Sequence, residues 1–163
     1  VVLQHEIPLE TVHYVIEFCY EKGIKIVLNP APAAAVPMEI IDKVTYVTPN
    51  EHEAVLIFGD KLSTEDLLRK YPEKLVITQG SRGVSTCLKD GRILNIPARK
   101  AQVVDTTGAG DTLNGAFSVQ IAEGKAIEDA LTYANVAASL STEKFGAQTG
   151  MPTAEEVETE LKK

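Results

Sequence analysis

The sequence contains no tryptophan and only two cysteines and three histidines among its 163 residues. Cys19 and Cys87 lie far apart and form no Cys-x-x-Cys pair, which argues against a disulfide framework and against a thiolate metal site. We expect both to be buried thiols in a reducing cytoplasm. The histidines at positions 5, 13 and 52 share no spacing typical of zinc ligands, so we predict no zinc site.

Long apolar runs and clusters of positive charge are also missing. No stretch approaches the roughly 20 apolar residues that cross a membrane as a helix, and we recognise no signal peptide, so we expect a cytoplasmic protein without a membrane partner. The net charge is -7, with 16 basic and 23 acidic residues, and there is no basic run. This balance argues against nucleic-acid binding, so any phosphate site must be local and geometric.

Strand and helix patterns alternate along the chain, and each predicted strand is a continuous apolar run. This pattern predicts an α/β fold in which a mostly parallel sheet is layered between helices, as one domain over residues 1–163. An Asp-Gly pair at 90–91 predicts a β-hairpin. Predicted strands cover residues 1–3, 24–28, 44–47, 75–77, 84–88, 92–96 and 103–104. Predicted helices cover 8–22, 37–41, 51–58, 111–122 and 127–142, with two more that begin near Ser63 and Thr153.

The segment 103–117, VVDTTGAGDTLNGAF, suggests a short buried strand, a glycine-rich turn and a helix N-terminus. The N–H groups of the first turn of a helix have no partner within the helix, and Gly108 and Gly110 would let an anion reach them. Asp111 would repel a phosphate, so its carboxylate suggests a proton acceptor beside a transferring phosphoryl group. Alternatively, Asp111 is only an N-cap and the glycines form an ordinary tight turn.

No Lys-Ser/Thr pair follows the second glycine, so this is not a Walker loop. The segment closely resembles the D-T-x-G-A-G-D signature of the ribokinase-like (PfkB) carbohydrate kinases, which continues with F/L-x-G, here at Gly115. Further family motifs occur in order along essentially the whole chain and are most similar to those of ribokinases. They are Q-x-E at 4–6, N-P-A-P at 29–32, T-P-N-E-x-E at 48–53, T-x-G-S-R-G at 78–83 and K-x-G-A-Q at 144–148.

Taken singly, each of these motifs also has a purely structural interpretation. Asn50 is a plausible helix cap, and Glu53 is an acid that the helix dipole favours in the first turn. Gly80 and Gly83 suit a tight turn, and Glu6 suits a solvated surface position.

The resemblance implies transfer of the γ-phosphoryl group of ATP to the primary hydroxyl of ribose, giving ribose 5-phosphate. In this mechanism Asp111 accepts the hydroxyl proton, while the N–H groups of Gly108, Ala109, Gly110 and Asp111 stabilise the developing charge. By the same resemblance, Glu6 binds a sugar hydroxyl.

The resemblance also implies a set of nucleotide and metal contacts. Asn50 would contact the nucleotide phosphates, and Glu53 would organise Mg²⁺ through water. The nucleotide pocket would include Thr78, Gln79, Gly80, Ser81, Arg82, Gly83, Gly110, Asp111 and Asn135. An activating K⁺ would bind at Asp105, Thr107, Ser141, Lys144, Gly146 and Gly150, although many relatives carry serine at the last position.

Members of this family are nearly twice as long, and their amino-terminal half supplies the remaining strands, other sugar-binding loops and a lid that forms the dimer contact. We therefore expect this chain to be the carboxy-terminal half of a kinase that is a homodimer at full length, with possible self-association of the fragment. The alternatives are a nucleotide-binding module without turnover, or a related kinase for another sugar or a nucleoside.

Overall fold

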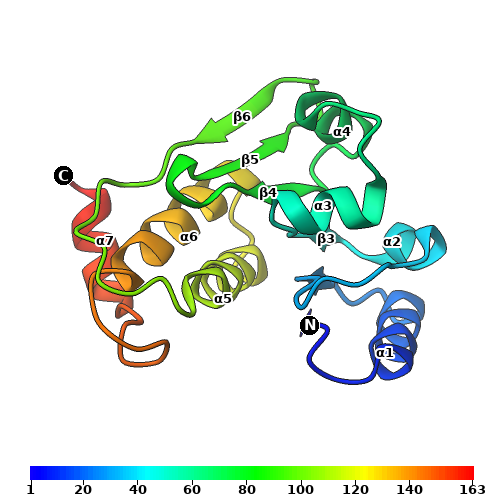
Figure 1. Ribbon diagram of the computed structural model, residues 1–163, viewed down its shortest axis with the longest axis horizontal. Helices are drawn as coiled ribbons and strands as arrows, with labels where there is room; N and C mark the ends of the chain where they lie inside the picture. Colours follow the sequence, from blue (N-terminus) through cyan, green and yellow to red (C-terminus); the bar gives the residue numbers. More distant parts are fainter. The chain divides into compact units, whose positions relative to one another are not determined.

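The computed structural model describes all 163 residues and has the expected α/β architecture, with a parallel sheet and helices (Figure 1). The chain forms two compact units. The first comprises residues 1–79 and 85–94, and the second comprises residues 80–84 and 95–163.

The first unit contains a parallel sheet in the order β1-β2-β3. Its strands are β1 (Val2–Leu3), β2 (Val27–Leu28) and β3 (Tyr46–Val47). This confirms the predicted strand-helix-strand unit with a parallel pair. The strands are shorter than predicted because neighbouring backbone groups have other partners. The N–H of Ile24 donates to the carbonyl of Cys19 at the end of the helix, and that of Ile26 donates to the hydroxyl of Thr45.

Four helices belong to the first unit: α1 (Leu9–Glu21), α2 (Met38–Lys43), α3 (Glu51–Phe58) and α4 (Thr64–Lys70). Pro8 is the N-cap of α1 rather than its first helical residue. Val12, Ile16 and Cys19 recur at helical spacing on its buried face and join the core of the unit. Cys19 and Cys87 are both free and buried, as predicted.

A second sheet has the order β4-β5-β6. Its strands are β4 (Val76–Thr78), β5 (Val84–Cys87) and β6 (Ile93–Ile96), and a 3-10 turn, η1 (Gly80–Arg82), follows β4. The predicted hairpin turn is present. Gly91 has a φ of 85°, and the N–H of Leu88 donates to the carbonyl of Arg92 at 2.9 Å.

The second unit is built on three helices: α5 (Ala109–Ala122), α6 (Ile127–Ser141) and α7 (Ala154–Leu161). Helix α6 packs against both α5 and α7. Phe117 and Leu131 are fully buried within the unit. Thr153 and Glu156 form a capping box at the start of α7, as local rules predict.

The predicted buried strand at Val103 and Val104 is wrong. Both residues lie outside any strand, and their side chains are 61% and 62% exposed. The N–H groups of Val104 and Asp105 both donate to the carbonyl of Thr142, just beyond α6, instead of to a neighbouring strand. Helix α5 also begins at Ala109, earlier than predicted, with Gly108 as its N-cap.

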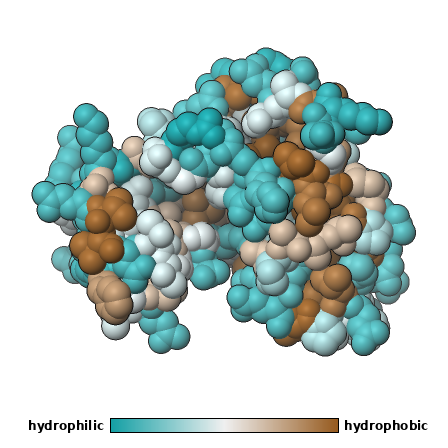
Figure 2. Space-filling view, viewed as in Figure 1, coloured by the Kyte–Doolittle hydropathy of each residue, from teal (hydrophilic) through white to brown (hydrophobic).

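Apolar side chains reach the surface of the first unit, visible as brown areas among hydrophilic ones (Figure 2). Phe18 on α1 and Val55 and Leu56 on α3 are about half exposed. Isolated exposed apolar residues are ordinary in folded proteins, so the predicted self-association stays a prediction. No helix is long and apolar enough to cross a membrane.

Candidate active site

The glycine turn before α5 has two glycines in different surroundings. Gly108 has a φ of 79°, and a Cβ placed on it would lie 3.0 Å from Cβ of Ala147. Glycine is therefore required there for both conformation and space. A Cβ on Gly110 would meet nothing within 4 Å, so the space beside this residue is open. The N–H of Ala109 donates to the carbonyl of Thr106 at 3.2 Å. The N–H groups of Gly110 and Asp111 are therefore better placed to donate hydrogen bonds to an anion.

Asp111 is the third residue of α5, and it is exposed. Because the N-cap is Gly108 and no side chain caps the helix, the alternative interpretation of Asp111 as an N-cap is wrong. The Asp111 carboxylate makes no hydrogen bond or ion pair within the chain, so it is free to accept a proton. A free carboxylate beside open helix N–H groups is the arrangement that a general base next to a phosphoryl group needs.

Asp105 joins the turn to the segment after α6. Its Oδ1 accepts a hydrogen bond from the N–H of Thr107, and its Oδ2 accepts one from the N–H of Gly146, both at 2.9 Å. Hydrogen bonds from Thr107, followed by the one from Gly146, hold the pKa of the Asp105 carboxyl below its usual value. The carboxylate therefore stays ionised and keeps the two segments together.

Three backbone carbonyls converge beside Gly150. A Cβ on this glycine would lie 2.6 Å from the oxygen of Ser141, 2.8 Å from that of Gly146 and 3.5 Å from that of Lys144. All three belong to the predicted cation site. Carbonyl oxygens are the ligands that replace the hydration shell of K⁺, so this donor set fits a monovalent cation.

The side chains of this cluster point to other partners. The hydroxyl of Ser141 donates to the carbonyl of Ala138, and the ammonium of Lys144 pairs with Glu156 at 3.1 Å. Ser141 and Lys144 therefore offer the cluster only their carbonyls. Gly150 offers no side-chain oxygen, and a Cβ at this position would lie too close to the carbonyl oxygens of Ser141 and Gly146.

Two predicted nucleotide-pocket residues hold the backbone that follows β6. The amide Nδ2 of Asn135 donates to the carbonyls of Pro97 at 2.8 Å and Ile96 at 3.3 Å. A Cβ on Gly83 would lie 2.0 Å from the Ile96 oxygen and 2.6 Å from the Ala98 nitrogen. Both residues therefore have a structural role within the second unit, and their contact with a nucleotide stays a prediction.

The rest of the T-x-G-S-R-G motif forms the turn after β4. Gly80 has a φ of 55° and its carbonyl accepts the N–H of Gly83, as expected for a tight turn. Ser81 and Arg82 lie on this turn and are exposed. In the first unit, Oε1 of Gln79 accepts a hydrogen bond from the hydroxyl of Ser85 at 2.6 Å.

In the first unit, Asn50 and Glu53 form a complete capping box at the start of α3. Glu53 N–H donates to Oδ1 of Asn50 at 2.9 Å, and Asn50 N–H donates to Oε2 of Glu53 at 2.7 Å. The helix-cap interpretation is therefore confirmed. An isolated parallel bridge also joins Asn50 to Thr78, which brings two predicted nucleotide contacts side by side. The second carboxylate oxygen of Glu53 makes no hydrogen bond, and one carboxylate with waters is a common way to bind Mg²⁺.

The turn that carries Glu6 is fastened through its neighbour His5. His5 N–H donates to the carbonyl of Ala31 at 2.8 Å, and its ring Nδ1 lies 3.2 Å from the carbonyl of Pro32. The Q-x-E and N-P-A-P motifs are thus adjacent, while Glu6 itself is exposed.

His5 is buried, and Nε2 of both His5 and His13 is buried without a partner. Burial lowers the pKa of His5, an effect that the nearby His13 reinforces. Sequence reasoning missed this pair because the spacing of the histidines matches no known motif.

Comparison with known proteins decides the family. The model of the pfkB family carbohydrate kinases matches residues 2–154. The chain belongs to the pfkB family. It is 53% identical over 158 residues to a ribokinase of Bacillus subtilis and 51% identical over 163 residues to one of Lactococcus lactis. These alignments cover 97% and 99% of this chain and 53% of each relative.

Solved structures agree with this pfkB assignment. The structure of Arabidopsis thaliana ribokinase complexed with ribose and ATP superimposes with a TM-score of 0.90 at 31% identity. This superposition covers 100% of the chain and 55% of the Arabidopsis protein. The chain therefore spans about half the length of the ribokinases that it matches, and it aligns with their carboxy-terminal half, as the motifs predicted.

Proposed function

We propose that the chain is the nucleotide-binding part of a pfkB kinase that transfers the γ-phosphoryl group of ATP to the primary hydroxyl of ribose, giving ribose 5-phosphate. The observation that carries the proposal is the turn at α5, where open space beside Gly110 adjoins the free carboxylate of Asp111. The similarity to ribokinases supports ribose as the acceptor. On this proposal, residues 1–163 act as one nucleotide-binding domain.

Each group in the proposed transfer has a defined chemical task. The hydroxyl oxygen of the sugar forms a bond to the γ-phosphorus while the bond from that phosphorus to the leaving ADP oxygen breaks. The carboxylate of Asp111 takes the hydroxyl proton as the nucleophile attacks. The N–H groups of the turn, chiefly those of Gly110 and Asp111, stabilise the charge on the phosphoryl oxygens. Glu6 binds a hydroxyl of the sugar.

We assign the remaining nucleotide contacts by the resemblance of the motifs to those of ribokinases. Asn50 would contact the nucleotide phosphates, and the residues from Thr78 to Gly83 and Asn135 would line the nucleotide pocket. The places of Asn50 at the start of α3 and of Thr78 to Gly83 at the end of β4 support this assignment, because ligands of α/β folds bind where the strands end.

Two cations complete the proposal. Glu53 would hold Mg²⁺ through water. The carbonyls of Ser141, Lys144 and Gly146, with Asp105 and Thr107 from the segment before α5, would hold K⁺ near Gly150. Bound cations supply positive charge that offsets the charge of the phosphates.

The first test is calorimetric titration of the chain with Mg-ATP in potassium buffer, followed by ribose with ADP release measured. Binding with ribose-dependent ADP release supports the proposal. Binding without release supports a nucleotide-binding module, and absence of binding contradicts the assigned site. Release with a nucleoside or another sugar but not with ribose would correct the acceptor.

The second test is Asp111→Asn. This change removes the proton acceptor but keeps the size of the side chain. We expect turnover to fall at least about a hundredfold, with little change in ATP affinity. Turnover close to that of the unmodified chain would contradict the role of Asp111. Glu155→Gln on α7 is a matched control, because it removes one exposed carboxylate outside the proposed site.

A further inference from the structure

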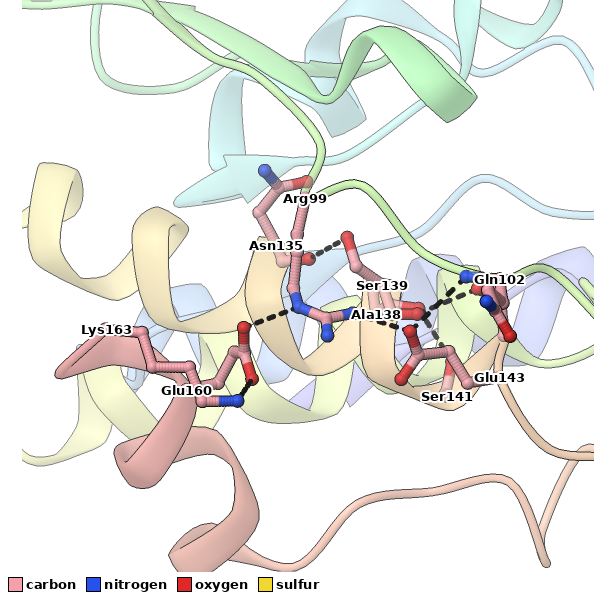
Figure 3. Close-up of polar contacts among 10 residues, drawn as sticks. Arg99, Gln102, Asn135, Ala138, Ser139, Ser141, Glu143, Glu160 and Lys163 are labelled. Carbon is pink, nitrogen blue, oxygen red and sulfur yellow. Dashed lines mark hydrogen bonds and ion pairs between the residues drawn. The ribbon is translucent and has the colours of Figure 1, made fainter.

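Arg99 links two segments of the second unit that are distant in sequence (Figure 3). Its Nε donates to Oε1 of Glu160 on α7, and its Nη1 donates to Oε1 of Glu143 just beyond α6, both at 2.7 Å. The side chain of Arg99 is 25% exposed, and that of Glu160 is 16% exposed. We call these three residues the Arg99 clamp.

The clamp is more than an isolated surface ion pair. One guanidinium bonds to two carboxylates at short distance, and such charge-assisted hydrogen bonds are stronger than neutral ones. Hydrogen bonds to Glu143 and Glu160 raise the pKa of Arg99, while bonds from Lys163 and then Arg99 lower the pKa of Glu160. Arg99 and Glu160 therefore remain charged, and the guanidinium geometry fixes where the carboxylates of Glu143 and Glu160 lie.

The clamp lies beside the backbone that leads to the glycine turn before α5. Glu143 Oε1 also accepts the N–H of Gln102 at 3.4 Å (Figure 3). The carbonyl of the preceding residue, Thr142, accepts the N–H groups of Val104 and Asp105 at 2.8 and 3.1 Å. Residues 102–105 are therefore held by polar contacts to residues 142 and 143, the latter a member of the clamp.

Apolar burial does little to hold this segment. Val103 and Val104 are exposed, and no strand pairs with them. Asp105, which ends the segment, bonds to the N–H of Gly146 within the carbonyl cluster. The placement of the glycine turn and of the carbonyl cluster therefore depends on the same few polar contacts.

We propose that Arg99 is a positioning residue, which holds residues 102–105 through Glu143 and anchors them to α7 through Glu160. By doing so it sets the geometry of the turn at Gly108–Asp111 for a nucleotide phosphate. This inference rests on the proposed function for its ligand. The effect of Arg99 on the mobility of residues 102–105 can be measured without any ligand.

The test compares Arg99→Gln with Arg99→Lys in the full chain, and Glu155→Gln is the control. Glu155 is exposed on α7 and makes no ion pair, so its change alters charge on the same helix without touching the clamp. Lysine keeps the charge but cannot bond to two carboxylates as a fork, so it tests whether geometry or charge matters. Thermal unfolding identifies any variant that fails to fold.

The ligand-free measurement is hydrogen exchange at the backbone amides of Val104, Asp105 and Gly146. We expect Arg99→Gln to speed exchange at these three sites, Arg99→Lys to have a smaller effect, and Glu155→Gln to have none. Unchanged exchange in folded Arg99→Gln overturns the inference. If Arg99→Gln does not fold, Arg99→Lys decides: faster exchange at the three amides supports the inference, and unchanged exchange overturns it.

The ligand measurement is the Kd of Mg-ATP by calorimetry. Changes within a coupled network alter affinity by about two- to thirtyfold, and we expect Arg99→Gln to weaken ATP binding within this range. Equal weakening by Glu155→Gln would overturn the inference, because it would indicate a general charge effect. If the unmodified chain binds no ATP, the proposed function fails, and the exchange result still decides whether Arg99 positions the segment.

Discussion

Replacing Gly110 with alanine separates folding from phosphate binding. Gly110 is the second residue of α5, and a Cβ added there meets nothing within 4 Å. Alanine is favoured over glycine in helices by up to about 1 kcal/mol. Gly110→Ala is therefore expected to leave stability unchanged or to raise it, which corresponds to a melting temperature higher by about 2–4 °C at most.

On the proposed function, the same methyl group would fill open space beside Gly110 through which a phosphate reaches its N–H. A hydrogen bond to a charged group contributes about 1.5–3 kcal/mol. Its loss corresponds to a roughly 10- to 150-fold increase in Kd. We therefore expect Gly110→Ala to weaken Mg-ATP binding at least about tenfold while the protein stays fully folded.

The assay pairs thermal unfolding with calorimetric titration of Mg-ATP. Gly115→Ala is the matched control, because Gly115 is an exposed glycine of the same helix whose Cβ position is also open. This control should gain stability without a change in Kd. ATP binding by Gly110→Ala as tight as that of the unmodified chain would refute the phosphate site, and a loss of stability would refute the geometry of the turn.

Two further changes test the carbonyl cluster beside Gly150 and the buried histidine. In Gly150→Ala the new Cβ would lie 2.6 and 2.8 Å from the oxygens of Ser141 and Gly146. We therefore expect the free energy of unfolding to fall by about 1–3 kcal/mol, and we expect K⁺ no longer to raise the melting temperature. Unchanged stability with intact K⁺ dependence would contradict this geometry. Burial lowers the pKa of His5, so the folded state binds fewer protons than the unfolded state, and stability should fall as the pH drops below about 6.5. Urea unfolding at several pH values measures this fall, and the same dependence in His5→Leu would show that His5 is not its source.

Local rules predicted much of this fold because the signals lie within a few residues of one another. The boundaries of α3 follow from the apolar positions between Asn50 and Gly59, and the capping box adds hydrogen bonds within one turn. The Asp-Gly turn before β6 needs only the positive φ that glycine adopts easily. The glycine turn at 108–110 is predictable for the same reason, as is the helix that follows it.

Burial was less predictable, because it depends on partners that are distant in sequence. Val103 and Val104 have the composition of a core strand, yet their neighbour in space is the carbonyl of Thr142 and their side chains face solvent. His5 lies in a polar turn, yet it is buried without a partner for Nε2. No local pattern carries this information.

The sequence alone predicted the family, most of the strands and helices, and the chemical groups at the glycine turn before α5, because motifs and helix ends are local properties of the chain. Only the tertiary structure decided how those groups are held. It places three carbonyls beside Gly150, leaves space open at Gly110, and brings the carboxylates of Glu143 and Glu160 to Arg99. The Arg99 contacts join residues that are distant in sequence, which no local pattern of the sequence encodes.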